Sequence, residues 1–99
     1  MKQLDRQTIE AKALELFKPL AVYDFYQEDV TATVSIADSK QVLVEIGCMY
    51  ESPKQDEAAL EALRVFLGAE HIDVHYDISE GGCESCDHGS RYGYAVRAW

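Results

Sequence analysis

The chain has 99 residues, 47% of them hydrophobic, and a formal net charge of −9. That composition supports one folded domain, which we assign to residues 1–99, and argues against intrinsic disorder. A surface this acidic repels phosphate backbones, so we expect no direct binding to nucleic acid. No apolar run approaches the roughly 18 to 20 residues of a membrane span, and the first residues lack a signal-peptide core. We therefore expect a cytoplasmic protein without a membrane partner.

An amphipathic helix is predicted from Asp5 to about Lys18, because apolar residues recur at steps of three and four. Asp5 is placed to act as the N-cap, and Pro19 disfavours helical geometry in the residue before it. The charges are of both signs, which favours a helix that covers a core over one that lies on a membrane. The apolar stripe consists of Ile9, Ala13, Leu16, Phe17 and Leu20.

Three strands are predicted next, joined by polar turns into an antiparallel meander. Val22–Tyr26 is rich in β-branched and aromatic residues, whereas Val30–Ile36 and Gln41–Tyr50 alternate between two faces. Cys48 falls on the more apolar face of the third strand, where a lone cysteine is usually a small buried hydrophobe.

A second helix is predicted to begin with Ser52 as its N-cap. Pro53 would take the first helical position, and Gln55 would close a capping box. Gly68 is a natural C-terminal cap, so the helix should end there and pack on the sheet. The apolar stripe consists of Ala59, Leu60, Leu63, Phe66 and Leu67.

Two further strands, Ile72–Ile78 and Tyr92–Trp99, should form a hairpin with a long loop. In the first of them the apolar residues should be buried, which leaves Asp73, His75 and Asp77 on the outer face. An imidazole between two acids resembles a general base, but an exposed strand face is favoured because no nucleophile lies beside it in sequence. We expect an α+β domain in the order α-β-β-β-α-β-β, with two helices on one face of a five-stranded, mostly antiparallel sheet.

The loop Gly81–Ser90 holds two of the three cysteines. Cys83 and Cys86 have the two-residue gap that lets both thiolates bind one tetrahedral zinc ion. His88 is close enough in sequence to be a third ligand. The candidates for a fourth ligand are Cys48, His71, His75 and Asp87.

Two other accounts of this loop remain open. A dithiol could cycle with a disulfide, but this motif opens a strand rather than a helix, and acidic neighbours at Glu80, Glu84 and Asp87 disfavour a reactive thiolate. Alternatively, the glycines only make turns in a solvated hairpin loop. We find no complete catalytic motif, so enzyme activity stays open and a non-enzymatic role is favoured.

Two intervals of the chain lack lysine and arginine, one between Arg64 and Arg91 and one from Val22 to Ser39. Acidic residues and tyrosines are interleaved in both, a composition suited to binding a basic protein surface. The predicted binding residues are Asp73, Asp77, Glu80, Glu84, Asp87, Tyr92, Tyr94 and Trp99.

We therefore expect a small, acidic, non-enzymatic interaction module. A specific form of this hypothesis is an inhibitor that imitates nucleic-acid charge and occupies a partner's basic groove, as small acidic proteins of viruses and mobile elements can do. The alternative is a small zinc-binding domain centred on Cys83, Cys86 and His88, structural rather than hydrolytic. The sequence leaves the oligomeric state open.

Overall fold

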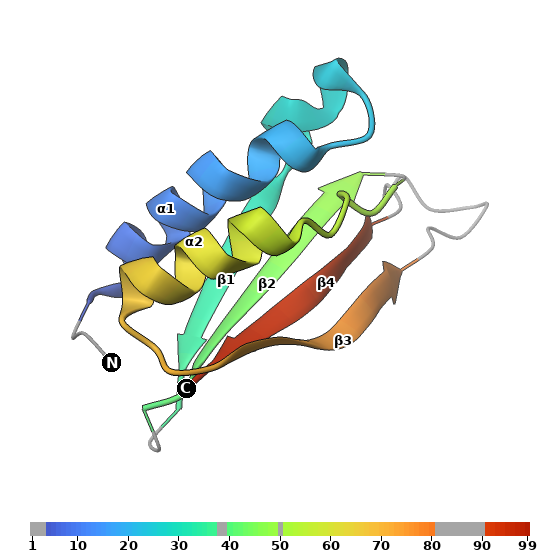
Figure 1. Ribbon diagram of the computed structural model, residues 1–99. Coiled ribbons are helices and arrows are strands. Elements are labelled where there is room, and N and C mark those ends of the chain that lie inside the picture. The colour runs from blue at the N-terminus through green and yellow to red at the C-terminus, as the bar shows by residue number, and fades with distance from the viewer. Residues whose placement is uncertain (1–3, 38–39, 50, 81–90) are drawn as a thin grey trace.

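Two α-helices lie side by side on one face of a four-stranded antiparallel sheet in the computed structural model (Figure 1). The structure describes residues 4–37, 40–49, 51–80 and 91–99. The sheet order is β1-β2-β4-β3, so β1 and β3 are the edge strands. The α+β class is confirmed, with four strands in the described part of the chain where five were predicted. The elements are α1 (Arg6–Phe17), the 3-10 helices η1 (Lys18–Leu20) and η2 (Asp24–Asp29), β1 (Thr31–Ile36), β2 (Val42–Met49), α2 (Glu57–Leu67), β3 (Ile72–Glu80) and β4 (Arg91–Ala98).

The first helix begins where the sequence predicts. The Asp5 carboxylate accepts a hydrogen bond of 2.7 Å from the Thr8 backbone N–H, as an N-cap does. Hydrogen bonding by Thr8 also holds the pKa of Asp5 below its ordinary value. Ile9, Ala13 and Phe17 are buried, which confirms the apolar stripe as the face of α1 that packs on the sheet.

The strand predicted at Val22–Tyr26 is wrong, because this segment runs into the 3-10 helix η2. Its aromatic rings contact one another instead of a neighbouring strand. Phe25 lies 5.4 Å from Tyr23 and 4.3 Å from Tyr26, measured between ring centroids. The Tyr26 N–H donates to the Tyr23 carbonyl at 2.9 Å, a local bond that bends the chain. The predicted meander is therefore reduced to the β1–β2 hairpin.

The predicted start of the second helix at Ser52 is also wrong. Helix α2 begins at Glu57, and Asp56 caps it by accepting a hydrogen bond of 3.1 Å from the Ala58 N–H. Gly68 ends the helix as predicted, in the left-handed conformation at φ 68°.

Tertiary hydrogen bonds hold the segment before α2 in a non-helical conformation. The Lys54 N–H donates to the Leu20 carbonyl at 2.8 Å, and the Lys54 carbonyl accepts a bond of 3.0 Å from the Tyr94 hydroxyl. Both bonds join Lys54 to residues far from it in sequence. They override the local capping signal, which is a weak determinant of where a helix starts.

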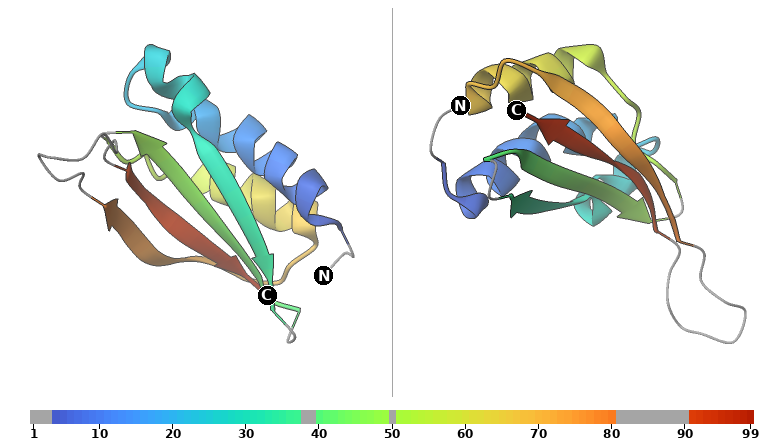
Figure 2. Two further views of the ribbon diagram at one scale, coloured as in Figure 1. Left: turned by 180° about the vertical axis from the view of Figure 1, so that it is seen from behind. Right: turned by 90° about the horizontal axis from the view of Figure 1, so that it is seen from below.

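A β-bulge in β3 overturns the predicted alternation of that strand. Val74 pairs with Val96 and Tyr76 pairs with the adjacent Ala95, so His75 is an extra residue. Because side chains alternate along a strand, the extra residue exchanges the two faces beyond it. We call the sheet side away from the helices the open face (Figure 2, left). The residues of β3 on the helix side are Ile72, Val74, Asp77 and Ser79, and those on the open face are Asp73, Tyr76 and Ile78.

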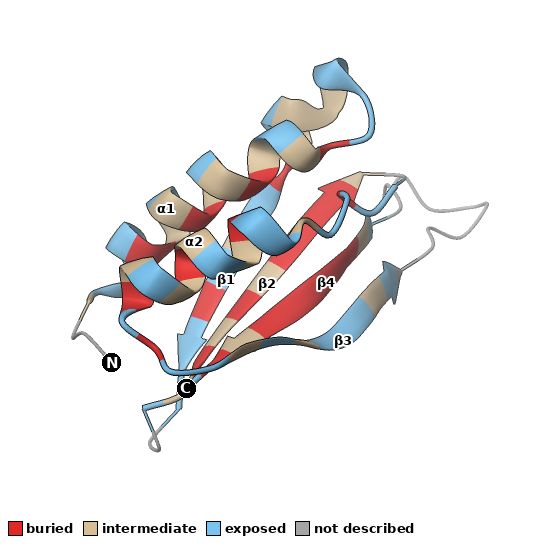
Figure 3. Ribbon diagram, in the orientation of Figure 1, coloured by how far each residue is buried: buried red, intermediate tan, exposed pale blue. Residues whose placement is uncertain are grey.

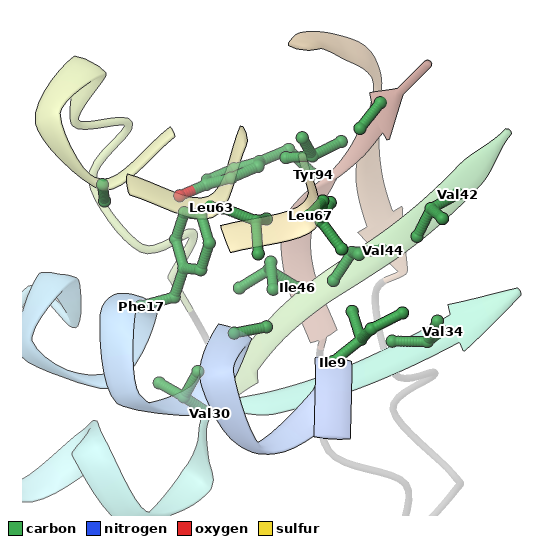
Figure 4. Packing of buried hydrophobic residues seen from close by; sticks show 14 of the residues in the cluster. Ile9, Phe17, Val30, Val34, Val42, Val44, Ile46, Leu63, Leu67 and Tyr94 are labelled. Atoms are coloured by element: carbon green, nitrogen blue, oxygen red, sulfur yellow. The ribbon is translucent and has the colours of Figure 1, made fainter. Parts of the chain in front are cut away.

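The core fills the space between the helices and the sheet (Figures 3 and 4). Tyr94, at the centre of this layer, packs edge-on against Phe17 with 6.1 Å between ring centroids. Cys48 is 1% exposed, as predicted for a buried hydrophobe, and burial raises the pKa of its thiol. The largest fully buried side chains are Tyr94, Phe17, Ile9, Ile46, Leu63, Leu67, Val44, Val96 and Cys48.

Two paired glycines, Gly47 in β2 and Gly93 in β4, let the central strands meet closely. A Cβ atom at Gly93 would lie 1.8 Å from the Ile46 carbonyl oxygen, which is fixed backbone. A Cβ atom at Gly47 would lie 2.8 Å from a guanidinium nitrogen of Arg91, the end of a flexible side chain. That guanidinium crosses over Gly47 and donates a hydrogen bond to the Thr31 hydroxyl on the far strand.

We predict that Gly93→Ala lowers the free energy of unfolding by about 2–3 kcal/mol, because the backbone must move to admit a methyl group. Gly47→Ala should cost about 1 kcal/mol or less, since Arg91 can shift. Both changes restrict the unfolded chain equally, so their difference isolates the clash. Urea unfolding of the two variants measures it, and equal stabilities would contradict the close approach at Gly93.

Candidate interaction surface

The predicted binding residues in the described chain do not form one patch. Asp73 and Trp99 lie near one end of the β3–β4 pair, where Ile72 faces Ala98. Tyr92 lies near the other end, roughly 20 Å away for a strand that rises about 3.3 Å per residue. The bulge also places Asp73 and Asp77 on opposite sides of the sheet. Glu84 and Asp87 lie outside the described residues, and Glu80 is placed only as the last residue of β3.

Tyr94 is not a surface residue, which corrects the prediction that it contacts a partner. Its side chain is 0% exposed, and the Lys54 carbonyl accepts its hydroxyl hydrogen bond at 3.0 Å. Burial, with a smaller contribution from the negative charge of Asp56, strongly raises the pKa of Tyr94. Tyr92, which pairs with Cys48 on the helix side, is half-buried.

Trp99 keeps one accessible side, being 37% exposed. Its ring stacks on His71 at 5.3 Å, and the Arg97 guanidinium lies 4.8 Å from the ring centroid. Backbone hydrogen bonds of 2.9 and 3.1 Å tie Trp99 to His71 in both directions. Trp99 is therefore held in place at the end of the sheet opposite η2.

The most exposed aromatic residues in the described chain belong to the segment that was predicted to be a strand. Phe25 is 70% exposed and Tyr23 is 48% exposed, while Tyr26 is half-buried beneath them. The rings contact one another, with 5.7 Å between the centroids of Tyr23 and Tyr26. We call Tyr23, Phe25 and Tyr26 the aromatic cluster. The sequence signal for this cluster is the presence of three aromatic residues within four positions. Their β propensity, however, led to the prediction of a strand instead of a 3-10 helix.

Acidic residues share the segment that holds the aromatic cluster. Asp24, Glu28 and Asp29 lie in the same short helix, and Glu28 makes one ion pair of 3.8 Å with Lys18. Glu28 is almost fully exposed, so this pair neutralises little of the local field. Thus η2 and the preceding Tyr23 combine large aromatic rings with carboxylates at one end of the molecule (Figure 1).

Acidic residues from both lysine- and arginine-free intervals lie at the same end of the sheet. Helix η2 precedes β1, and Glu80 ends β3 at the end where β1 begins. However, β1 and β3 are opposite edges, separated by three strand spacings or roughly 14 Å. The sheet therefore separates these two acidic regions, and η2 holds the denser one among the described residues.

The predicted zinc site stays a prediction. Cys83, Cys86 and His88 lie outside the described residues. In the described ranges, no group of three His, Cys, Asp or Glu residues is arranged to hold a metal ion. The thiol of Cys48 points to the Tyr26 carbonyl, at a sulfur–oxygen distance of 3.7 Å, and so already has an acceptor. None of the helices in the described chain is long and apolar enough to cross a membrane.

We predict that Tyr94→Phe makes the protein less sensitive to alkali. A tyrosine whose folded-state pKa is raised contributes stability that is complete below the unfolded pKa of about 10 and is lost as pH rises above it. At pH 7 the variant should lose about 1 kcal/mol with its hydrogen bond. Unfolding from pH 7 to pH 12 measures both effects, with exposed Tyr23→Phe as the control. Parallel curves for wild type and Tyr94→Phe would refute the assignment.

If the loop binds zinc, protein purified without chelator should contain about one zinc ion per chain. A chelator should lower the melting temperature, and Cys83→Ser should abolish zinc binding. Cys48→Ala tests whether Cys48 is a zinc ligand or only a core residue, because the variant should lose zinc only if Cys48 binds it. Substoichiometric zinc together with a melting temperature unchanged by chelation would remove the site.

The chain matches no known protein-family model, no curated protein and no solved structure. Its function is therefore inferred from the side chains that its surface presents.

Proposed function

We propose that the protein is a small, non-enzymatic interaction module that binds a basic protein surface through η2. The observation that carries the proposal is the exposure of Phe25 and Tyr23 among the carboxylates of Asp24, Glu28 and Asp29. Aromatic residues are favoured anchors at protein interfaces, and carboxylates complement lysine and arginine around them. The net charge of −9 would steer such a partner over longer distances.

The aromatic cluster is suited to binding because its rings are already in contact with one another. Phe25 stacks on Tyr23 at 5.4 Å and lies tilted against Tyr26 at 4.3 Å, so less side-chain freedom is left to lose on association. Removing a phenylalanine ring from water gives about 1.5–3 kcal/mol. One such anchor in a desolvated pocket is enough to act as a binding hot spot.

A more specific form of the proposal is that the partner is a nucleic-acid-binding protein and that the acidic groups imitate phosphates. Asp24, Glu28 and Asp29 give three carboxylates within the six residues of η2. Such a ligand would compete with DNA or RNA for a basic groove, and its binding would weaken as salt screens the charges. Inhibition by occupation of the groove requires no catalysis.

We predict that Phe25→Ala weakens partner binding by about tenfold or more, because it removes the main apolar anchor. Val65→Ala is the matched control, since Val65 is 56% exposed on α2, away from the aromatic cluster. The partner is first captured from lysate at low salt, then purified, and the affinities are measured by calorimetry. Equal losses for both variants would overturn the role of η2.

The charge component has a separate test. The double variant Asp24→Asn, Asp29→Asn should flatten the salt dependence of binding, whereas Glu70→Gln, near Trp99, should leave it unchanged. Double-stranded DNA should compete for the purified partner if the phosphate-imitation form is right. A partner that lacks a basic surface, or binding that is independent of salt, would refute the proposal.

A further inference from the structure

The bulge in β3 helps to form a cavity of about 270 Å³ on the open face. The cavity lies where β1 ends and β2 begins, at the opposite end of β1 from η2. It is thus independent of the proposed interaction surface. Its lining residues are Ser35, Ile36, Ala37, Gln41, Val42, Leu43, His75 and Arg97.

Arg97 brings a cationic donor to this cavity that the described protein does not satisfy. Its Nε is buried and has no hydrogen-bond acceptor among the described residues. Asp73 faces Arg97 across the β3–β4 ladder, but no ion pair within 4.0 Å joins Arg97 to any described residue. The contact that holds the guanidinium is the Trp99 ring, which offers no lone pair. A buried guanidinium N–H without an acceptor is unfavourable, so Arg97 keeps unused hydrogen-bonding capacity beside the cavity that it lines.

Besides Arg97, His75 is the other lining residue whose side chain is ionisable and can donate a hydrogen bond. It is the residue that the bulge inserts between Val74 and Tyr76. Bulges commonly redirect one side chain near a binding site, and this one brings an imidazole to the same cavity as Arg97. The Ser35 hydroxyl and the Gln41 amide add neutral donors. None of the described lining residues is Asp or Glu, so this part of the wall favours an anion over a cation.

The remaining lining is aliphatic and sets the chemical class of the ligand. Ile36, Ala37, Val42 and Leu43 form this part of the wall. A fully hydrated dianion would lose water against it without compensation. We propose that the cavity binds a carboxylate attached to a short apolar chain, with the planar guanidinium of Arg97 as the principal contact. The volume of about 270 Å³ limits the ligand to a small molecule or to the terminal residue of a peptide.

The test is titration of the isotope-labelled full chain with hexanoate, followed by NMR of the backbone amides and the Arg97 Nε–H. Hexanoate should give saturable shifts at Arg97, His75 and Leu43 below about 20 mM. Hexanol and hexylammonium, at matched ionic strength, should give none that saturate. Equal binding of hexanol, or no saturable shift with hexanoate, would overturn the proposal.

Arg97→Gln should weaken hexanoate binding at least about tenfold, and Arg97→Lys should weaken it less, since lysine keeps the charge but loses the planar fork. Arg91→Gln is the matched control, because it makes the same charge change at the other end of β4 on the open face. The amide spectrum of each variant shows whether it is folded. Unchanged binding by folded Arg97→Gln and Arg97→Lys would refute the site.

N-acetyl-leucine separates the two sources of the carboxylate. It presents the carboxylate as the C-terminal residue of a peptide does, whereas hexanoate represents a free aliphatic acid. Tighter binding of N-acetyl-leucine assigns the site to a chain terminus, and tighter binding of hexanoate assigns it to a small metabolite. Either result supports the carboxylate site provided that Arg97→Gln abolishes it.

Discussion

The hydroxyl of Tyr94 is buried in the core and therefore needs an acceptor, and the arrangement of the helix layer depends on where that acceptor lies. The Lys54 carbonyl accepts this bond, so the segment before α2 stays extended and the helix starts at Glu57. The N–H of the same Lys54 bonds to Leu20 at the end of η1. The Tyr94 ring meets Phe17 of α1 edge-on. One tyrosine in a central strand is thus linked both to the end of α1 and to the segment that precedes α2.

Features set by neighbours in sequence were predictable, and those set by distant contacts were not. The Asp5 cap, the Gly68 cap and the burial of Cys48 follow from local pattern. The bulge at His75 is defined by pairing with β4, and no residue in β3 marks it. The candidate surface likewise depends on contacts that the local sequence pattern does not reveal. Acids interleaved with aromatic residues led to the prediction of a binding surface, but alternation alone cannot tell an exposed Phe25 from a core tyrosine.

The fold divides its charge between two regions with different chemistry. Asp24 and Glu28 are exposed together with Phe25 on η2, at one end of the molecule. Arg97 lies at the other end of the sheet, partly shielded by Trp99 and by aliphatic side chains. Shielding matters because an anion approaching a chain of net charge −9 is repelled at long range and attracted only within the cavity. A chain so acidic can therefore still hold a local site for an anion.

The strand order β1-β2-β4-β3 has a consequence for how this protein folds during its synthesis on the ribosome. Strand β4 is inserted between two strands that precede it in the chain, and β2 and β3 both pair with it. During synthesis the β1–β2 hairpin can form early, but β3 has no sheet neighbour until β4 has emerged. Until then β2 presents a free inner edge of the kind that recruits chaperones or mispairs between nascent chains. The native sheet should therefore close in one late step, after Ala98 has left the exit tunnel.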